Sequence, residues 1–330
     1  MLPAPIDSIS FPLLLLLLFL LLLPLHLLLR PSLPPGLPRL PLLGSVPWIL
    51  WSGKHVMEIV KNDRRKHGPL SSVGFGPINL IFINDPSLIR EVLIREDMAG
   101  RPSSSLGLQM KSWGRKIGLI APDGNCPVWR EHRRFVMRGL REQGFGTRSE
   151  QSVLEEATAL VEHLLATSGE SVVIKEQFNI PVVNVIWKMV ANRTFSLGSS
   201  EGHRFMTLMD ELFSKSFPAL ALVPILGRLL IGKQIKRRFA MFAEMRELFL
   251  EVIEEHEQSL DESEPRDLID KYLVELRSGR PGFEKQQLVI IMLDLFAAGS
   301  ETTATTLRWA VLYLVLHPEV GYVAIACTLR

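Results

Sequence analysis

The sequence predicts a mainly α-helical protein with a small β-sheet, preceded by a transmembrane anchor. Three observations support this fold class. The first 30 residues contain 15 leucines. Apolar residues recur at three- and four-residue steps along much of the remaining chain, which is typical of amphipathic helices. Strand-like segments are predicted in one region, Leu70–Phe75 and Asn79–Ile83, where Gly76 and Pro77 between them indicate a short hairpin.

The N-terminal anchor is predicted from Ile9–Leu29, a stretch of 21 residues without a charged side chain. About 20 apolar residues in a helix span the hydrocarbon core of a bilayer. No basic residue precedes this stretch and no small-x-small cleavage site follows it, which favours an anchor in residues 1–30 over a cleaved signal peptide. Cationic residues follow it and none precedes it, so the positive-inside rule predicts a lumenal N-terminus and a cytosolic main domain.

Residues 31–44 form a proline-rich hinge that joins the anchor to the rest of the chain. Five prolines occur between Pro31 and Pro41, which predicts an extended, stiff segment. A plain linker and a rigid hinge that orients the following domain on the membrane are both compatible with this composition. From Ser45 onward no repeat or composition break occurs, so residues 45–330 are interpreted as one domain.

Two further helices have clear sequence signals. Ser152 and Glu155 have the spacing of a capping box, which predicts a helix that begins at this point. Apolar residues between Phe239 and Ile253 predict a long amphipathic helix. Ahead of it, the apolar stretch Phe217–Ile231 lies beside a group of cations and either dips into the membrane surface or forms a buried turn.

Charge and cysteine content exclude several classes of protein. The chain has 37 Lys and Arg against 35 Asp and Glu, a formal net charge of +2, which argues against a polybasic nucleic-acid-binding protein. Only Cys126 and Cys327 are present, so a disulfide-rich scaffold and a cysteine-based metal cage are excluded.

The segment Leu288–Leu316 is nearly apolar on all sides and predicts a helix that runs through a core. Asp294 and Glu301 argue against a membrane span there. A glycine and neighbouring threonines are unfavourable inside a helix, yet Gly299 precedes Glu301 and Thr302 directly. Two interpretations stay open: an acid and a hydroxyl that deliver protons beside a flat ligand, or a close crossing between two helices.

Trp129 and Arg133 are four residues apart in a predicted helix that follows the turn Asp123–Gly124. This spacing places an indole N–H and a guanidinium on one helical face, where both can meet one carboxylate or phosphate group. A solvated basic face is the alternative interpretation, since several other arginines follow in the same helix.

With these segments in view, the chain resembles the microsomal cytochrome P-450 haem-thiolate monooxygenases, of the family-two-like type. The motifs that carry the resemblance occur in the family's order along the chain. They are Pro34-Pro35-Gly36 in the hinge, Arg101-Pro102, Trp129-x-x-x-Arg133, Asn184-Val-Ile-Trp187, Pro265-Arg-Asp-Leu-Ile-Asp270, Asp294-Leu-Phe-Ala-Ala-Gly-Ser-Glu-Thr-Thr303 and His317-Pro318-Glu319.

The resemblance implies roles for individual residues. Glu301 and Thr302 would be the catalytic pair that handles protons during oxygen activation. The cofactor-binding residues would be Trp129, Arg133 and Arg115 at the haem propionates, with Ala298 and Gly299 over the haem. Residues implied on the substrate side are Gly118, Leu119, Ile120, Phe296 and Ala297.

The same resemblance implies the activity and its surroundings. It implies a haem-dependent monooxygenase that inserts one atom of dioxygen into a lipophilic substrate of the steroid, fatty acid or xenobiotic class. Electrons would come from an NADPH-dependent reductase or from a cytochrome b-type donor. The location implied is the endoplasmic reticulum membrane, and no nucleic acid is expected as a partner.

The proximal ligand that this family requires has no match in the sequence. A haem-thiolate enzyme needs a cysteine thiolate on the iron, which the family holds in a Phe-x-x-Gly-x-x-x-Cys-x-Gly loop, and neither that pattern nor a Glu-x-x-Arg after Glu319 occurs here. No metal-ligating residue is therefore assigned. We expect a chain that is truncated before this loop, through an incomplete gene model or a splice variant, and that is inactive alone. The alternatives are a non-catalytic isoform that binds the reductase or full-length relatives, and a product that is rapidly degraded.

Overall fold

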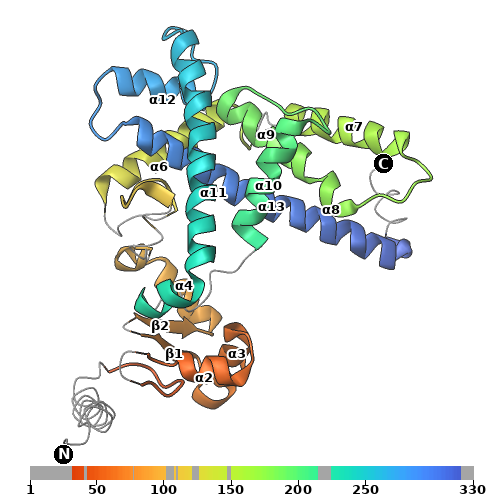
Figure 1. The fold of residues 1–330 in the computed structure, drawn as a ribbon. Coiled ribbons are helices and arrows are strands. Elements are labelled where there is room, and N and C mark those ends of the chain that lie inside the picture. The colour runs from red at the N-terminus through yellow and green to blue at the C-terminus, as the bar shows by residue number, and fades with distance from the viewer. Residues whose placement is uncertain are drawn as a thin grey trace, which may run out of the picture. The chain divides into compact units, whose positions relative to one another are not determined.

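The computed structural model describes residues 32–40, 43–76, 78–101, 108, 111–120, 126–146, 150–214 and 224–320. The predicted anchor in residues 1–30, the turn Asp123–Gly124 and Cys327 lie outside the described residues. Helices predominate and the described residues contain one two-stranded sheet, which confirms the predicted mainly helical class (Figure 1). The chain divides into two compact units, residues 1–98 with 217–235 and residues 99–216 with 236–330, so residues 45–330 contribute to both.

The first unit contains the predicted hairpin. Strands β1 (Leu70–Phe75) and β2 (Ile78–Ile83) are antiparallel, with Leu70 opposite Ile83. The helical elements of this unit, apart from the start of α11, are α2 (Val46–Ser52), α3 (Val56–His67), α4 (Pro86–Leu93) and the 3-10 turn Glu96–Met98. Its small core is formed by Val46, Ile49, Val60, Val73 and Phe75.

The proline-rich segment is part of this unit. The backbone N–H of Ser72 in β1 donates to the carbonyl oxygen of Pro35 at 3.0 Å. Gly36 pairs with Ser72, and Gly44 pairs with Phe75 at the other end of the strand. Backbone of β1 occupies the space where a Cβ of Gly36 would lie, so glycine is required for this contact. Pro35, Gly36 and Gly44 are therefore held against the sheet.

The second unit is helical. Its elements are α6 (Pro127–Glu142), α7 (Glu150–Ala166), α8 (Ile174–Gln177), α9 (Asn179–Ala191), α10 (Ser200–Ser214), α12 (Leu268–Arg277) and α13 (Lys285–Leu316), with α11 (Pro224–Ser259) from Lys236 onward. Helices α9 and α13 pack together over an aromatic cluster. The ring of Trp187 lies 4.5 Å from that of Phe296, between centroids, and Phe195, Phe205 and Phe249 also contact Trp187.

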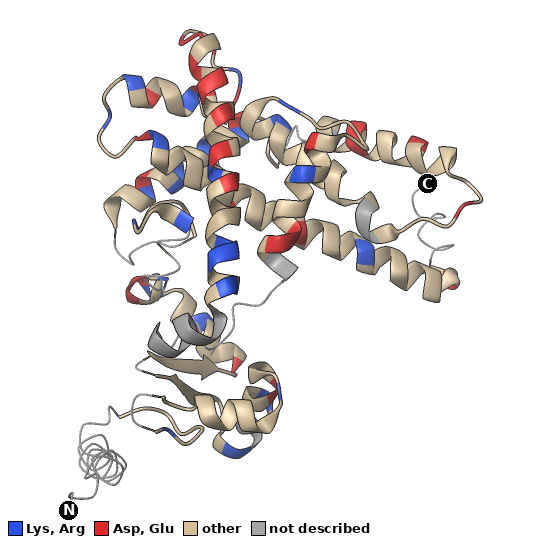
Figure 2. Cartoon of the chain, viewed as in Figure 1, with Lys and Arg blue, Asp and Glu red and all other residues tan. Residues whose placement is uncertain are grey.

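Two predicted helices differ in their outcome. The long helix is confirmed as α11, whose described charges change from cations near Lys236 to acids near its C-terminal end (Figure 2). The predicted start at Ser152 is wrong, because α7 already begins at Glu150 and Ser152 lies within its first turn. Leu154 and Leu165 of α7 are 53% and 67% exposed.

Helix α13 is the central element of the second unit. It is long and apolar enough to cross a membrane, but 61% of its apolar window is buried inside the protein. The residues from Leu288 to Leu293 are almost fully buried, as predicted for a helix that runs through a core. Toward its end the helix becomes exposed, with Trp309 at 66% and Leu316 at 66%.

Candidate functional site

Ala298 and Thr302 are two small, exposed side chains on the same face of α13, and this pair is called the step below. They are one helical turn apart, and both are exposed. The Thr302 hydroxyl donates to the carbonyl oxygen of Ala298 at 2.8 Å. The hydroxyl proton is therefore used in a hydrogen bond to the helix backbone, but the oxygen has lone pairs that can accept another hydrogen bond.

Glu301 is partly buried and is held in place by its own helix. Its Oε1 accepts a hydrogen bond from Nη2 of Arg308 at 3.0 Å and another from the hydroxyl of Thr305 at 2.9 Å. Arg308 also donates to Thr305 at 2.8 Å, so the three side chains form a closed network. A hydrogen bond from a guanidinium stabilises the ionised carboxylate. The acid next to Thr302 is therefore held in a fixed position by two hydrogen bonds.

Gly299 faces away from this step and toward α9. A Cβ at Gly299 would be 2.7 Å from Cδ1 of Ile186 on α9, so the absence of a side chain permits close packing of the two helices. This supports the second of the two interpretations of the glycine, a close helix crossing. Ala297 is partly buried, and Phe296 is fully buried in the aromatic cluster.

The three predicted substrate-side residues Gly118, Leu119 and Ile120 lie against the buried half of α13. Oδ2 of Asp294 accepts hydrogen bonds from the backbone N–H groups of Leu119 at 2.6 Å and Ile120 at 3.0 Å. Oε1 of Gln287 accepts one from Gly118 at 3.0 Å. A carboxylate and an amide from one helix therefore hold three consecutive backbone groups of this loop.

Asp294 also binds a cation. The ammonium group of Lys111 forms an ion pair with its second oxygen, and the Asp294 side chain is only 1% exposed. Sequence reasoning used Asp294 to argue against a membrane span and as part of a family motif, but it assigned this side chain no partner and missed Lys111. The sequence did contain a signal that Asp294 has a partner. It is a single acid within the apolar stretch Leu288–Ala298, and a buried charge needs a compensating group. Nothing in the sequence pairs it with Lys111, which lies 183 positions earlier.

Trp129 and Arg133 are brought together at the start of α6. The guanidinium carbon of Arg133 lies 5.5 Å from the centroid of the Trp129 ring. The indole N–H, however, donates to the carbonyl oxygen of Leu119 at 3.0 Å. The exposed Arg133 is thus the member of this pair whose cation faces solvent, while Trp129 ties α6 to the loop beside α13.

Arg115 is bonded to the beginning of α13. Its guanidinium forms an ion pair with Glu284 and donates to Oε1 of Gln286 at 2.6 Å. The hydrogen bond to Glu284 raises the pKa of Arg115 further above its ordinary value. Arg115 and Arg133 therefore have different surroundings, and the contacts of Arg115 tie it to α13.

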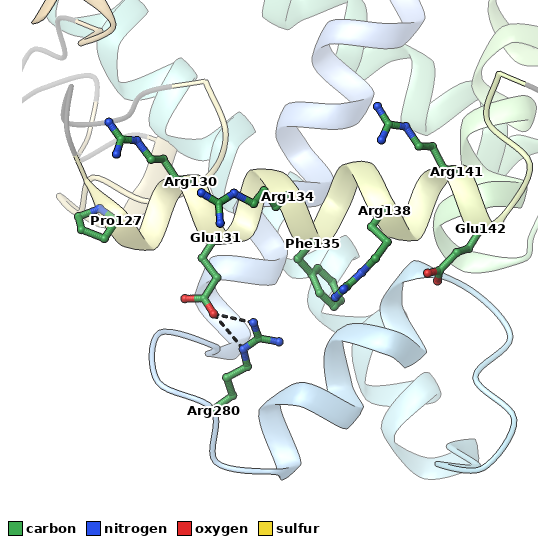
Figure 3. A pocket seen from close by; sticks show the side chains of 9 residues that line it. All are labelled: Pro127, Arg130, Glu131, Arg134, Phe135, Arg138, Arg141, Glu142 and Arg280. Carbon is green, nitrogen blue, oxygen red and sulfur yellow. Dashed lines mark hydrogen bonds and ion pairs between the residues drawn. The ribbon is translucent and has the colours of Figure 1, made fainter. Parts of the chain in front are cut away.

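A basic hollow of about 870 Å³ lies along α6 and next to the loop that carries Arg280 (Figure 3). The arginines that line it from α6 are Arg130, Arg134, Arg138 and Arg141. Glu131 forms an ion pair with Arg280 at 2.6 Å at one edge, and Glu142 pairs with Lys271. Positive charge predominates in the hollow, which suits an anionic partner.

Comparison with known proteins decides the family. The family model of cytochrome P450 matches residues 34–322. The chain belongs to the cytochrome P450 family. This P450 is 32% identical over 308 residues to cytochrome P450 2L1 of Panulirus argus, with 88% of this chain and 61% of that protein covered.

Two other relatives are similar to a comparable degree. Farnesoate epoxidase of Bombyx mori is 31% identical over 306 residues, which cover 87% of this chain and 59% of that protein. Cytochrome P450 2J2 of Homo sapiens is 32% identical over 298 residues, which cover 87% and 58%. The chain thus spans about 60% of the length of the relatives it matches.

Membership of the P450 family implies a haem-iron cofactor, and the described residues fit one side of it. The step of small side chains at Ala298 and Thr302 leaves open backbone on α13 that a flat ring can approach. Arg133 offers an exposed cation for a carboxylate. Cys126, the one described cysteine, occupies the N-cap position of α6 without a side-chain hydrogen bond to the helix. Its sequence context does not match the family's ligand loop.

Proposed function

We propose that this P450 chain forms the oxygen-activating side of a haem-dependent monooxygenase that inserts one atom of dioxygen into a lipophilic substrate. The observation that carries the proposal is the exposed step Ala298–Thr302 next to the positioned Glu301. Haem, when bound, supplies the iron that activates dioxygen. A thiolate ligand for that iron would have to come from a cysteine loop that these 330 residues do not contain.

Glu301 and Thr302 would move protons on this face. The Thr302 hydroxyl donates a hydrogen bond to the carbonyl oxygen of Ala298, which orients it. Its oxygen would accept a hydrogen bond at the same time. Glu301 is held close by Arg308 and Thr305, so it would receive a proton from solvent and pass it on through water. Arg133 would bind a haem propionate, and Trp129 would support it by holding the loop at Leu119.

The substrate would contact the loop at Leu119 and Ile120. Asp294 and Gln287 satisfy the backbone N–H groups of this loop, so apolar side chains are what it presents to a ligand. An apolar wall suits a lipophilic molecule. The name of the relative farnesoate epoxidase supports the same class of substrate.

Haemin binding to the purified chain tests the haem-facing role of α13. Ala298→Leu places a large side chain on the proposed face, and Ala310→Leu makes the same change at another exposed alanine of α13. We expect Ala298→Leu to weaken haemin affinity about ten-fold, the effect of a clash of 1–3 kcal/mol, and Ala310→Leu to leave it unchanged. Equal effects of the two variants, or no saturable binding by the native chain, would contradict the proposal.

The spectrum of the bound haem tests the missing thiolate. We expect no thiolate-type spectrum when the haemin-loaded chain is reduced and exposed to carbon monoxide, and no monooxygenase turnover. A thiolate-type spectrum would show that Cys126 or Cys327 binds the iron, and the proposed assignment of ligands would then be wrong.

Membrane attachment and the redox partner are part of the same proposal. The apolar residues 9–29 would anchor the protein in the endoplasmic reticulum membrane, with the N-terminus in the lumen and both compact units in the cytosol. The basic hollow on α6 would receive an acidic surface of an NADPH-dependent reductase or of a cytochrome b-type donor.

The hollow also supports a second candidate function, a non-catalytic protein that binds the reductase. Binding of purified reductase can be measured for the double variant Arg134→Glu/Arg138→Glu. The matched control, Lys61→Glu/Arg90→Glu, changes the charge equally at two exposed positions outside the hollow. We expect the double variant to lower affinity at least about ten-fold at low salt, and the control to have little effect. Reductase binding without haem binding would favour this second function, and binding that is insensitive to the double variant would exclude the hollow as the interface.

A further inference from the structure

Trp113 has a backbone conformation that is rare for a bulky residue. Its φ is +51°, in the left-handed region, and within the described residues only Asn192 shares this property among non-glycine residues. Such a conformation costs about 1–3 kcal/mol and persists only where surrounding contacts enforce it. The contacts around Trp113 therefore have to be strong enough to hold this unfavourable backbone conformation.

Arg246 of α11 provides these contacts. Its guanidinium carbon lies 4.6 Å from the centroid of the Trp113 ring, within the range of a cation–π interaction. Its Nη1 donates to the carbonyl oxygen of Lys111 at 3.3 Å. The residue is only 9% exposed, and burial lowers the pKa of its guanidinium from the ordinary value. A cation is thus kept inside the protein to hold both ends of one three-residue turn.

This turn is coupled to the substrate-side loop. Lys111, whose carbonyl is held by Arg246, forms the ion pair with Asp294 through its side chain. Asp294 in turn accepts the N–H groups of Leu119 and Ile120. A continuous set of contacts therefore leads from α11 through Lys111 and α13 to the loop.

We propose that Arg246 is a positioning residue that latches the segment Lys111–Ile120 against α11 and α13, and that its release opens the apolar wall presented to substrate. The substrate role of this wall rests on the proposed function, but the latch does not. Because Arg246 is on α11 and Asp294 is on α13, both helices have to be in place before the segment closes.

Hydrogen exchange of the full chain, without haem or substrate, tests the latch. Five backbone N–H groups of the segment are hydrogen-bonded, those of Gly114, Arg115, Gly118, Leu119 and Ile120. We expect Arg246→Met to raise their exchange rate about five-fold, with the exchange of α12 unchanged. Arg246→Lys keeps the charge and should restore part of the protection. Glu251→Met, an exposed change on the same helix, should have no effect.

A second variant keeps the test decisive if Arg246→Met disturbs folding. Trp113→Gly removes the ring and suits a φ of +51°, so it should preserve the fold yet raise exchange in the same segment. Adding Arg246→Met to Trp113→Gly should then give less than the product of the two separate effects. Exchange that rises equally in α12, or that does not change in either variant, would overturn the latch. Failure of haemin binding would overturn the proposed function and leave these results unaffected.

Discussion

Gly118 lies directly against the carboxylate of Asp294, and a Cβ at this position would be 2.5 Å from Oδ2. The backbone of Gly118 has a φ of +93°, which residues that carry a side chain rarely adopt. Two independent constraints, space and conformation, therefore require glycine at the point where the loop Gly118–Ile120 meets α13.

Gly118→Ala should destabilise the second unit by more than backbone strain alone. The strain and the clash together should cost about 2–4 kcal/mol in the free energy of unfolding. Gly279→Ala is the matched control, because Gly279 has a φ of +74° but open space around it. Denaturant unfolding of both variants separates the two contributions. Equal losses would show that the contact with Asp294 is unimportant.

Asp294→Ala should be among the most damaging single changes on α13. It leaves the ammonium group of Lys111 without its counter-charge and the N–H groups of Leu119 and Ile120 without an acceptor. Removal of one member of a buried ion pair costs about 3–5 kcal/mol. Lys111→Met in the same background should recover part of this loss, since the uncompensated charge is then gone. Unfolding midpoints of the single and double variants provide the measurement.

Gly299→Val should weaken the packing of α9 against α13. A Cβ there would be 2.7 Å from Cδ1 of Ile186, so added carbons force the helices apart, at a cost of about 1–3 kcal/mol. Ile186→Ala should partly compensate, which a double-mutant cycle of unfolding free energies detects. Strictly additive losses would mean that Gly299 is present for another reason, such as access of a flat ligand.

His256 should make stability depend on pH. Its Nδ1 lies 2.7 Å from the carbonyl oxygen of Val252, and its Nε2 lies 2.9 Å from Oδ2 of Asp267. Burial lowers the pKa of His256, but the hydrogen bond and charge of Asp267 outweigh burial and leave the pKa raised. The charged imidazolium is thus the form that folding favours.

A raised histidine pKa stabilises the folded state at low pH. The contribution of His256 is fully present below about pH 6.5, its value in the unfolded chain, and is lost as pH rises through the folded-state pKa. The stability difference between the native chain and His256→Gln should therefore shrink from pH 6 to pH 8.5 in urea unfolding. His163→Gln, at an exposed position, is the control. A difference that grows with pH would contradict the assigned charge.

Local patterns in the sequence were sufficient for the helical class and the hairpin. Gly76 and Pro77 between two strand-like segments predicted β1 and β2, and a nearly apolar stretch predicted the buried part of α13. The same reasoning misplaced the start of α7, because Ser152 has the right neighbours for a cap although the helix begins at Glu150. Helix boundaries depend on backbone geometry that a short pattern does not determine.

The sequence by itself determined the helical class and singled out unusual residues as candidates, and the tertiary structure decided what each one touches. Asp294 could be recognised as an unusual acid, but its partners Leu119 and Ile120 lie about 175 positions away in the chain. The indole N–H of Trp129, predicted to face an anion, is bonded to the carbonyl of Leu119. Such long-range contacts depend on how helices pack, because burial obliges each polar group to find a partner wherever the fold brings one within reach.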